Sequence, residues 1–274
     1  EIFLDDESIV TNVTLNTDGI YTSDIAPKCD DLYISTKTKV LFLNQALDLN
    51  HIFWKLKINQ YHDLTDGIIK KQMKIVSTSS EEYEEYKTKI TDIPYYKETI
   101  LKQIDNPDAR RIKFKDERKI TIGLSNKDII NFRGKQKNAF YNCFALIFRF
   151  KYKLEYKEIH VKVFNTGKLE MPGVVNNEIL EIVKTILLKN LEPLVTTNLK
   201  FNEDCPDENV LINSNFNCCF YINREKLHKL LSSKYLMETA FDPCSYPGVK
   251  CKYYFNNEKK FDDNEQTGRI DKLD

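Results

Sequence analysis

Two neighbouring segments rich in apolar and aromatic residues, the second of which alternates apolar and polar residues over 159–164, constrain the fold of this chain more than any other feature. They run over 144–153 (FALIFRFKYK) and 156–164 (YKEIHVKVF), with two residues between them. Successive side chains of a β-strand point to opposite faces of the sheet, so each segment predicts a strand with one apolar face. Because the connection is so short, the two strands should pair as an antiparallel hairpin.

The residues that follow the hairpin predict a turn, a short strand and a long helix. Asn165-Thr166-Gly167 is typical of a tight turn, and 168–171 predicts a third strand that ends at Pro172-Gly173. Asn176 or Asn177 can cap the helix, because an Asn side chain accepts hydrogen bonds from the first-turn N–H groups. Apolar residues at helical spacing form its predicted buried stripe: Ile179, Ile182, Val183, Ile186 and Leu187.

A strand–helix–strands order occurs twice along the chain. The first copy starts with a predicted strand at 33–44 and a helix capped by Asp48 that runs to about 58. The second copy starts with a strand at 210–222 and a helix capped by Asn223, and reaches a strand at 249–255. The later strands and the closing helix of the second copy are not among these 274 residues.

This order predicts an α+β fold with a curved antiparallel sheet, helices on its convex face, and two pseudo-repeats of which the second is incomplete. We expect residues 1–30 to form an N-terminal appendage with a hairpin at Asp18-Gly19. The first repeat should span 31–201 and the second 202–274. We expect 59–136 to be an insertion with its own partial packing, because loops longer than about 15 residues usually carry structure or function.

Basic residues are concentrated in one part of the chain, although its net charge is zero. The chain carries 41 Lys and Arg against 41 Asp and Glu, but 110–168 contains 16 Lys and Arg against 5 Asp and Glu. A basic stretch of this kind favours contact with phosphates, because neutralised phosphates release counterions. A solvated strand surface is the alternative explanation. No run of 18 apolar residues occurs, so we expect no membrane-spanning helix.

No motif for catalysis or for binding a metal, a cofactor or a small-molecule substrate occurs in the sequence. The four histidines lie outside any metal motif, and no phosphate-binding glycine loop or nucleophile elbow is present. The seven cysteines follow no zinc or disulfide spacing and are expected to be reduced, as in an intracellular compartment. We therefore expect a protein that is not an enzyme.

Several segments resemble the TATA-binding proteins in their order and spacing. Residues 161–187 (VKVFNTGKLEMPGVVNNEILEIVKTIL) resemble the strand–turn–strand–helix segment of that family, and Tyr246-Pro247-Gly248-Val249 resembles the Phe-Pro-Gly-Leu of its second repeat. The divergent members encoded by large nucleocytoplasmic DNA viruses are more similar, through 138–142 (NAFYN) and the Cys-Lys-Tyr-Tyr segment at 251–254. The resemblance covers roughly 33–58 and 139–255.

The resemblance implies a saddle whose concave face binds the minor groove of A·T-rich promoter DNA. Aromatic side chains would wedge between base steps, Asn would address base acceptors, and Lys would meet phosphates. Alternation within the predicted strands and the aligned positions give the candidate DNA-binding residues Phe144, His160, Lys162, Phe164, Lys168, Asn213, Asn215, Asn217, Tyr246, Lys250 and Lys252.

Two functions remain open at this point. The first is a viral transcription initiation factor that bends promoter DNA and recruits the viral RNA polymerase and a TFIIB-like factor, in the host cytoplasm or packaged in the virion. The second is a protein-interaction scaffold of the viral transcription machinery or virion with little DNA binding. Glu170 and Pro172 stand where the family has Val and Thr, and these two residues favour the scaffold.

Overall fold

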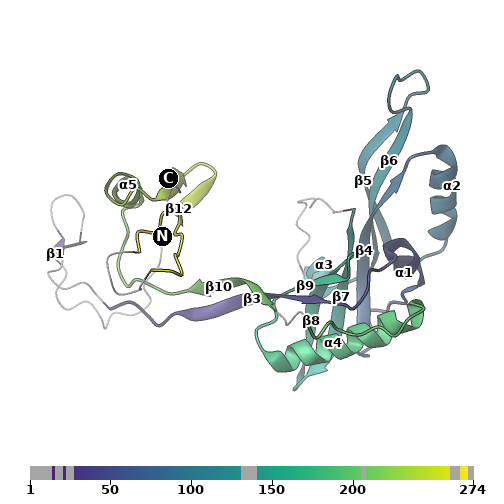
Figure 1. Cartoon of the computed structure of the whole chain (residues 1–274), viewed down its shortest axis with the longest axis horizontal. Helices are drawn as coiled ribbons and strands as arrows, with labels where there is room; N and C mark the ends of the chain where they lie inside the picture. The colour runs from purple at the N-terminus through teal and green to yellow at the C-terminus, as the bar shows by residue number, and fades with distance from the viewer. Residues whose placement is uncertain are drawn as a thin grey trace. The chain divides into compact units, whose positions relative to one another are not determined.

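The computed structural model describes residues 28–130, 141–204, 208–259 and 266–270, together with the backbone of 14–15 and 21–22 (Figure 1). The chain divides into two compact units. We call Tyr33–Asn215 the sheet unit, and Glu1–Leu32 with Phe216–Asp274 the terminal unit. The candidate site is built mainly on the sheet unit.

The sheet unit contains one curved antiparallel sheet of eight strands in the order β10-β3-β9-β8-β7-β4-β6-β5. Its strands are β3 (Tyr33–Phe42), β4 (Gly67–Ser77), β5 (Tyr96–Asp105), β6 (Phe114–Gly123), β7 (Cys143–Tyr152), β8 (Glu155–Phe164), β9 (Lys168–Pro172) and β10 (Glu208–Asn215). Every neighbouring pair is antiparallel, and the expected β7–β8 hairpin is confirmed, with Cys143 opposite Phe164.

Two of the helices described in the sheet unit begin at expected caps. The described helices are α1 (Leu49–Lys55), α2 (Ser80–Lys89), α3 (Asn126–Ile130) and α4 (Asn177–Leu191), followed by the 3-10 turn η1 (Glu192–Leu194). The Asp48 carboxylate accepts the His51 N–H at 3.0 Å, and the Asn176 amide oxygen accepts the Ile179 N–H at 2.8 Å. Asn176, rather than Asn177, therefore caps α4.

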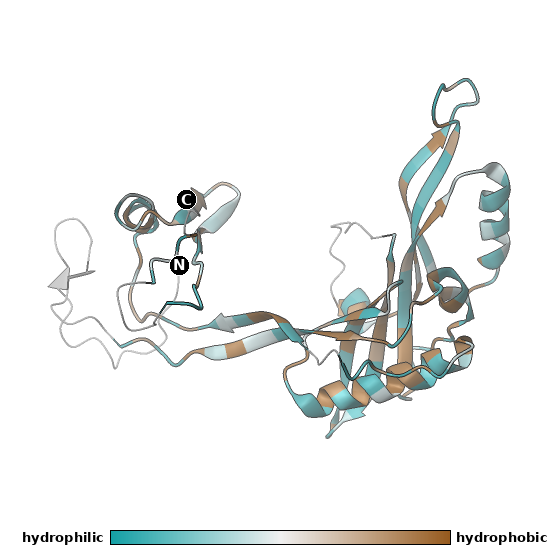
Figure 2. Cartoon of the chain, in the orientation of Figure 1, coloured by the Kyte–Doolittle hydropathy of each residue, from teal (hydrophilic) through white to brown (hydrophobic). Residues whose placement is uncertain are grey.

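Three helices share one apolar core on one face of the sheet. Phe53 of α1 lies 6.1 Å from Phe144 of β7 between ring centroids, and Val183 and Leu187 of α4 are fully buried in the same cluster. Figure 2 shows apolar residues along the strands and along α4, whereas α2 is mostly hydrophilic. α2 contributes the buried Tyr86 to this core and also makes polar contacts to β5 and β6, in which the Arg118 guanidinium donates to the Tyr83 hydroxyl at 2.7 Å.

The expected insertion at 59–136 is wrong as a separate subdomain. β4 pairs with β7 on one side and with β6 on the other, so residues of this stretch continue the main sheet. Alternating apolar residues such as Ile120 and Ile122 are buried in the common core, which explains why the segment packs with the sheet and not by itself.

The expectation that both repeats supply one sheet is confirmed only for the first strand of the second repeat. β10 pairs antiparallel with β3, but it ends at Asn215 and not near 222. In the terminal unit, β11 (Glu238–Asp242) and β12 (Tyr246–Lys252) form a two-stranded sheet of their own. α5 (Arg224–Lys229), capped by Asn223, and the π-helical turn η2 (Leu230–Lys234) lie against that sheet.

The N-terminal hairpin is present at the level of backbone pairing, because β1 (Thr14–Leu15) pairs antiparallel with β2 (Tyr21–Thr22). Asp18-Gly19 lies outside the described residues. Residues 28–30 join the C-terminal segment within the terminal unit, where the Asp30 N–H donates to the Asn217 carbonyl at 2.9 Å.

Candidate nucleic-acid interface

The face of the eight-stranded sheet opposite α1, α2 and α4 carries the polar residues of the alternating strands, and we call it the open face. On β8, Ile159, Val161 and Val163 are buried toward the helices, so His160, Lys162 and Phe164 point to the open face. Lys168 and Glu170 of β9 lie on the same face, because Lys162 is directly opposite Glu170 in the strand register. The alternation therefore places these sequence-predicted residues together.

The first charged cluster of the open face consists of Lys162, Glu170 and Lys168. Each lysine Nζ lies 3.1 Å from a different oxygen of the Glu170 carboxylate. Burial alone would raise the pKa of Glu170, but hydrogen bonds from Lys162 and Lys168 outweigh it and hold the pKa below its usual value. The carboxylate stays ionised, and the cluster carries one net positive charge.

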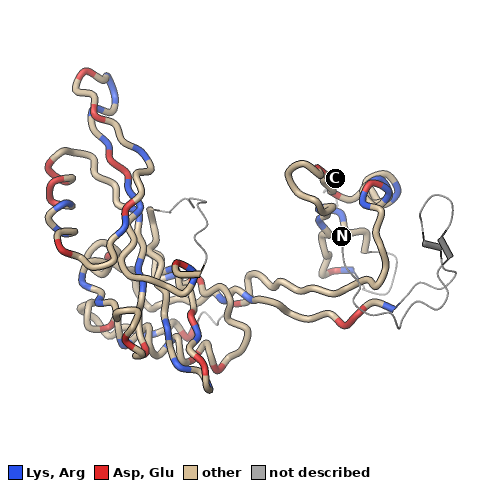
Figure 3. The backbone as a smooth tube through the Cα atoms, turned by 180° about the vertical axis from the view of Figure 1, so that it is seen from behind, with Lys and Arg blue, Asp and Glu red and all other residues tan. Residues whose placement is uncertain are grey.

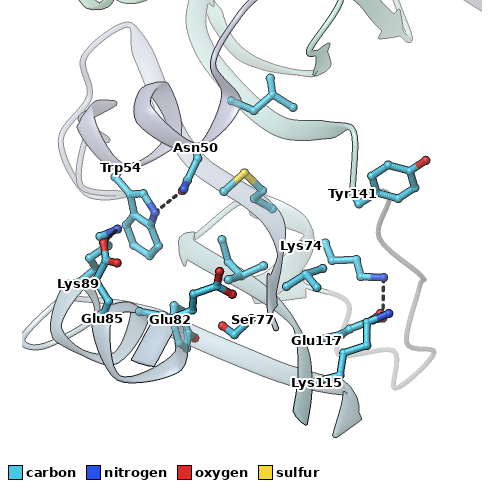
Figure 4. A pocket seen from close by; sticks show the side chains of 15 residues that line it. Asn50, Trp54, Lys74, Ser77, Glu82, Glu85, Lys89, Lys115, Glu117 and Tyr141 are labelled. Atoms are coloured by element: carbon cyan, nitrogen blue, oxygen red, sulfur yellow. Dashed lines mark hydrogen bonds and ion pairs between the residues drawn. The ribbon is translucent and has the colours of Figure 1, made fainter. Parts of the chain in front are cut away.

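A second cluster of the same composition lies on the open face at β4 and β6. The Lys74 Nζ is 2.7 Å and the Lys115 Nζ 2.6 Å from the two oxygens of Glu117 (Figure 4). Hydrogen bonds from Lys115 and Lys74 lower the pKa of Glu117 to about 2. Two Lys–Glu–Lys clusters thus give this side of the sheet a repeated, positively charged pattern.

The turn between β8 and β9 fixes Phe164 at the end of its strand. Gly167 has a φ of 83°, and a Cβ at this position would lie 2.4 Å from the Gln45 carbonyl oxygen, so only glycine fits. Lys168 returns along β9 and places its Nζ 5.5 Å from the centroid of the Phe164 ring. A partly exposed ring beside a cation is the arrangement that stacks on or wedges between bases at a phosphate backbone.

The other end of the open face is occupied by the chain itself. Lys70 of β4 donates to both oxygens of Asp128 of α3, at 2.7 and 2.6 Å, and the Asn126 N–H donates to Glu158 at 3.0 Å. Arg149, beside Glu158, lies between the rings of Tyr61 and Tyr156 at 5.2 and 5.5 Å from their centroids. Among the described residues, the end of the face that carries Phe164 is left accessible.

Phe144 is wrong as a DNA-contacting residue. Its side chain is fully buried and faces the helices, where it contacts Phe53. Phe144 and Phe164 lie on opposite faces because Cys143, and not Phe144, is directly opposite Phe164 in the β7–β8 register. A residue in this core could reach DNA only if the sheet opened.

Two of the three predicted asparagines of the second repeat lie on β10, and the third lies beyond its end. Asn213 and Asn215 are exposed on β10, opposite Thr36 and Tyr33 of β3. Asn217 belongs to the terminal unit, and its side-chain oxygen accepts the Cys219 N–H at 2.9 Å. Its local role is to shape the loop after β10.

Tyr246, Lys250 and Lys252 all lie on β12 of the terminal unit. Lys250 and Lys252 are opposite Ala240 and Glu238 and share one face of the two-stranded sheet, where the Lys250 Nζ is 5.0 Å from the Tyr246 ring centroid. Lys252 pairs with Glu238, which also accepts the Tyr254 hydroxyl at 2.9 Å. All three predicted residues are exposed.

The lysines of β4 and β6 were not predicted from the sequence as part of the site. The signal was present in 115–122 (KDERKITI), where Lys115, Glu117 and Lys119 alternate with residues that are buried. Two of the buried positions are occupied by the charged residues Asp116 and Arg118, so a search for alternating apolar and polar residues does not recognise this strand.

A cavity of about 690 Å³ borders the second cluster (Figure 4). One side is lined by Trp54 of α1, whose indole N–H donates to Asn50 at 2.8 Å, and the other by Lys74, Glu117 and the exposed Tyr141.

In the part of the chain that the structure describes, no group of three or more His, Cys, Asp or Glu side chains could hold a metal ion. None of the described helices is long and apolar enough to span a membrane.

Comparison with known proteins identifies no relative of this chain. No protein-family model matches the chain, and no curated protein matches it. The functional argument therefore depends on the open face itself.

Proposed function

We propose that this chain is a viral transcription initiation factor of the TATA-binding-protein-like class, which binds promoter DNA through the open face of its sheet unit. The observation that carries the proposal is the cluster at the end of β8 and β9. There, a partly exposed Phe164 lies beside Lys168, and Lys162 and His160 line the same face. An apolar ring flanked by cations suits a minor-groove contact, in which the ring unstacks a base step and the cations meet phosphates.

The arrangement of β3 and β10 supports a two-repeat saddle. Each is the first strand of one predicted repeat, and each is followed by a short helix with a side-chain cap, from Asp48 and Asn223. The two strands pair antiparallel, with Thr36 opposite Asn213. Antiparallel pairing of equivalent strands is what a local twofold relation between two repeats produces.

The helix-covered face is the side left for protein partners in this proposal. α4 exposes charged residues such as Glu181 and Lys184, which form an ion pair at 2.8 Å. A viral RNA polymerase and a TFIIB-like factor would dock on this side while the open face holds DNA.

The scaffold function is the second candidate, and Glu170 is the observation that favours it. Its carboxylate neutralises part of the charge of Lys162 and Lys168, the two lysines that the DNA proposal uses. Binding of the full chain to an A·T-rich duplex, followed by fluorescence anisotropy across a salt series, separates the two functions. The initiation factor predicts salt-dependent binding and DNA bending, whereas a scaffold predicts neither.

A further inference from the structure

The β5–β6 hairpin carries the most cationic accessible turn in the described part of the sheet unit. Its tip spans 106–113 and contains Arg110, Arg111 and Lys113, all exposed, with Asp108 as its one acidic residue (Figure 3). None of these three cations forms an ion pair with a described acidic residue. Many other surface lysines are paired, for example Lys87 with Glu84 and Lys184 with Glu181.

The tip projects beyond the strands that support the hairpin. β6 pairs with β4 only as far as Asp116, opposite Ser77, while β5 and β6 continue to the pair Asp105 and Phe114 (Figure 1). The turn itself is shaped by local hydrogen bonds, since the Asn106 N–H donates to the Lys113 carbonyl at 2.7 Å and the Asp108 N–H to the Asn106 side chain at 3.1 Å. Arg110, Arg111 and Lys113 therefore lie on a turn whose backbone is held by hydrogen bonds.

The hairpin lies on the same side and at the same end of the sheet as Phe164. Lys115 and Lys119 of β6 share the open face with Lys74, and Lys102 of β5 is opposite Glu117 on that face. The antiparallel order places the end of β4, the start of β7 and the end of β8 together, because Met73 is opposite Phe144 and Cys143 is opposite Phe164. The hairpin tip therefore extends the edge that carries Phe164.

The spacing of the strands matches several base pairs of duplex DNA. From β8 to β5 the sheet makes four strand-to-strand steps, which is roughly 19 Å at about 4.8 Å per step. At about 3.4 Å per base pair, this distance corresponds to roughly five or six base pairs. A duplex lying straight across the strands from Phe164 meets β6 near Lys119. Lys113 at the tip lies six residues farther along the chain, roughly 20 Å at about 3.3 Å per residue, so a duplex that runs obliquely over roughly eight base pairs reaches the tip.

We propose that the β5–β6 hairpin is a second DNA-contacting element, in which Arg110, Arg111 and Lys113 bind backbone phosphates of the duplex that flanks the Phe164 contact. This inference rests on the proposed function, because it requires duplex DNA on the open face. Its chemistry is sequence-independent, since phosphate contacts position a protein on the duplex and do not read bases. The hairpin adds affinity and footprint, and the bend arises at Phe164.

The test replaces Arg110, Arg111 and Lys113 together by Gln in the full chain. A matched control replaces Lys87, Lys184 and Lys189 by Gln, which removes the same charge from α2 and α4. Binding to a 30-base-pair A·T-rich duplex is measured by anisotropy across a salt series, and bending by energy transfer between end labels. The hairpin variant should weaken binding by roughly 10- to 100-fold near 0.1 M salt and lower the log–log salt slope by about two to three. Its bend should equal that of the unmodified chain at saturation.

The outcomes separate this inference from the proposed function. If the unmodified chain binds and bends the duplex but the hairpin variant matches the control variant in affinity and slope, the hairpin proposal is overturned and the proposed function stands. If the unmodified chain shows no salt-dependent binding, both fail. Loss of affinity with an unchanged bend supports the hairpin as a phosphate contact, whereas loss of the bend overturns the assigned division of roles.

Discussion

Lys162 and Glu170 lie directly opposite each other on β8 and β9, with the lysine Nζ 3.1 Å from a carboxylate oxygen. Lys168 holds the other oxygen at the same distance. A carboxylate on a DNA-binding face would repel phosphates if it stood alone, but here it is fixed between two cations. Glu170 therefore lowers the net positive charge of this part of the open face by one.

Replacing Glu170 by Gln should strengthen DNA binding. The change keeps the size of the side chain and frees the charges of Lys162 and Lys168, so the local net charge rises by one. Anisotropy with an A·T-rich duplex near 0.1 M salt should show an increase in affinity of roughly tenfold, with a salt slope steeper by about one. Glu84→Gln is the control, because Glu84 pairs with Lys87 on α2, away from the open face. Equal affinity of both variants would argue against DNA on this face.

Replacing Phe164 by Ala should reduce DNA bending more than the salt slope. The ring is proposed to unstack a base step, which costs a few kcal/mol and is offset by the contacts that the bent duplex makes. Energy transfer between end-labelled duplex ends should report a smaller bend in the saturated complex. Lys162→Gln is the paired variant and should show the opposite pattern, with a lower salt slope and an unchanged bend. If both variants bend DNA like the unmodified chain, Phe164 is not a wedge.

Lys71 should make stability rise with pH in the alkaline range. Its Nζ is buried and donates to the carbonyls of Phe53 and Leu56 at 2.6 and 2.7 Å, at the end of α1, and burial lowers its pKa to about 8. Because the folded pKa lies below the unfolded value, this contribution to stability is complete above the unfolded pKa and is lost as pH falls toward 8.

Chemical denaturation of the unmodified chain and of Lys71→Met, each at pH 7.5 and pH 10, measures this effect. The unmodified chain should gain about 2 kcal/mol relative to the variant between the two pH values. Ionisation of the tyrosines, including Tyr86 and Tyr96 with their raised pKa values, affects both proteins equally and cancels in the difference. A pH-independent difference would mean that Lys71 titrates normally.

Arg118 should be required for the packing of α2 on the sheet. Its guanidinium donates to Asp116 at 2.6 Å and to Glu98 at 2.6 Å, and lies 4.7 Å from the Tyr83 ring centroid. Arg118→Met leaves the buried Asp116 carboxylate without its cation and should destabilise the fold by about 3–5 kcal/mol. Lys102→Met, an exposed change on the same hairpin, should stay within about 0.5 kcal/mol of the unmodified chain in the same denaturation experiment.

The sequence predicted the elements whose signals are local. Alternation specified β7 and β8, Asp48 and Asn176 specified the starts of α1 and α4, and Gly167 specified the turn before β9. Strand pairing between distant segments was not predictable in the same way. The β4 sequence, 67–77 (GIIKKQMKIVS), contains buried lysines on both faces, Lys70 held by Asp128 and Lys71 held by the end of α1. An alternation rule cannot recognise a strand whose buried positions are filled by paired cations.

The candidate site was predicted correctly where one strand decides the orientation of its residues. His160, Lys162 and Phe164 share the open face because β8 is regular, whereas Asn217 lies after the end of β10, in the terminal unit. Phe144 failed as a prediction because similarity of residue type does not state which face a residue occupies. Only the pairing of β7 with β8 gives that information.

The central claim is that the open face of the sheet unit binds duplex DNA through Lys162 and Lys168, and the salt dependence of binding tests it most directly. The measurement compares the unmodified chain, the double variant Lys162→Gln/Lys168→Gln and the control Lys87→Gln/Lys184→Gln on one A·T-rich duplex. The account predicts that the double variant lowers the log–log salt slope by about two while the control leaves it unchanged, because each lost phosphate contact removes about 0.9 from the slope. Equal slopes for the double variant and the control, or no binding by the unmodified chain, would contradict the account.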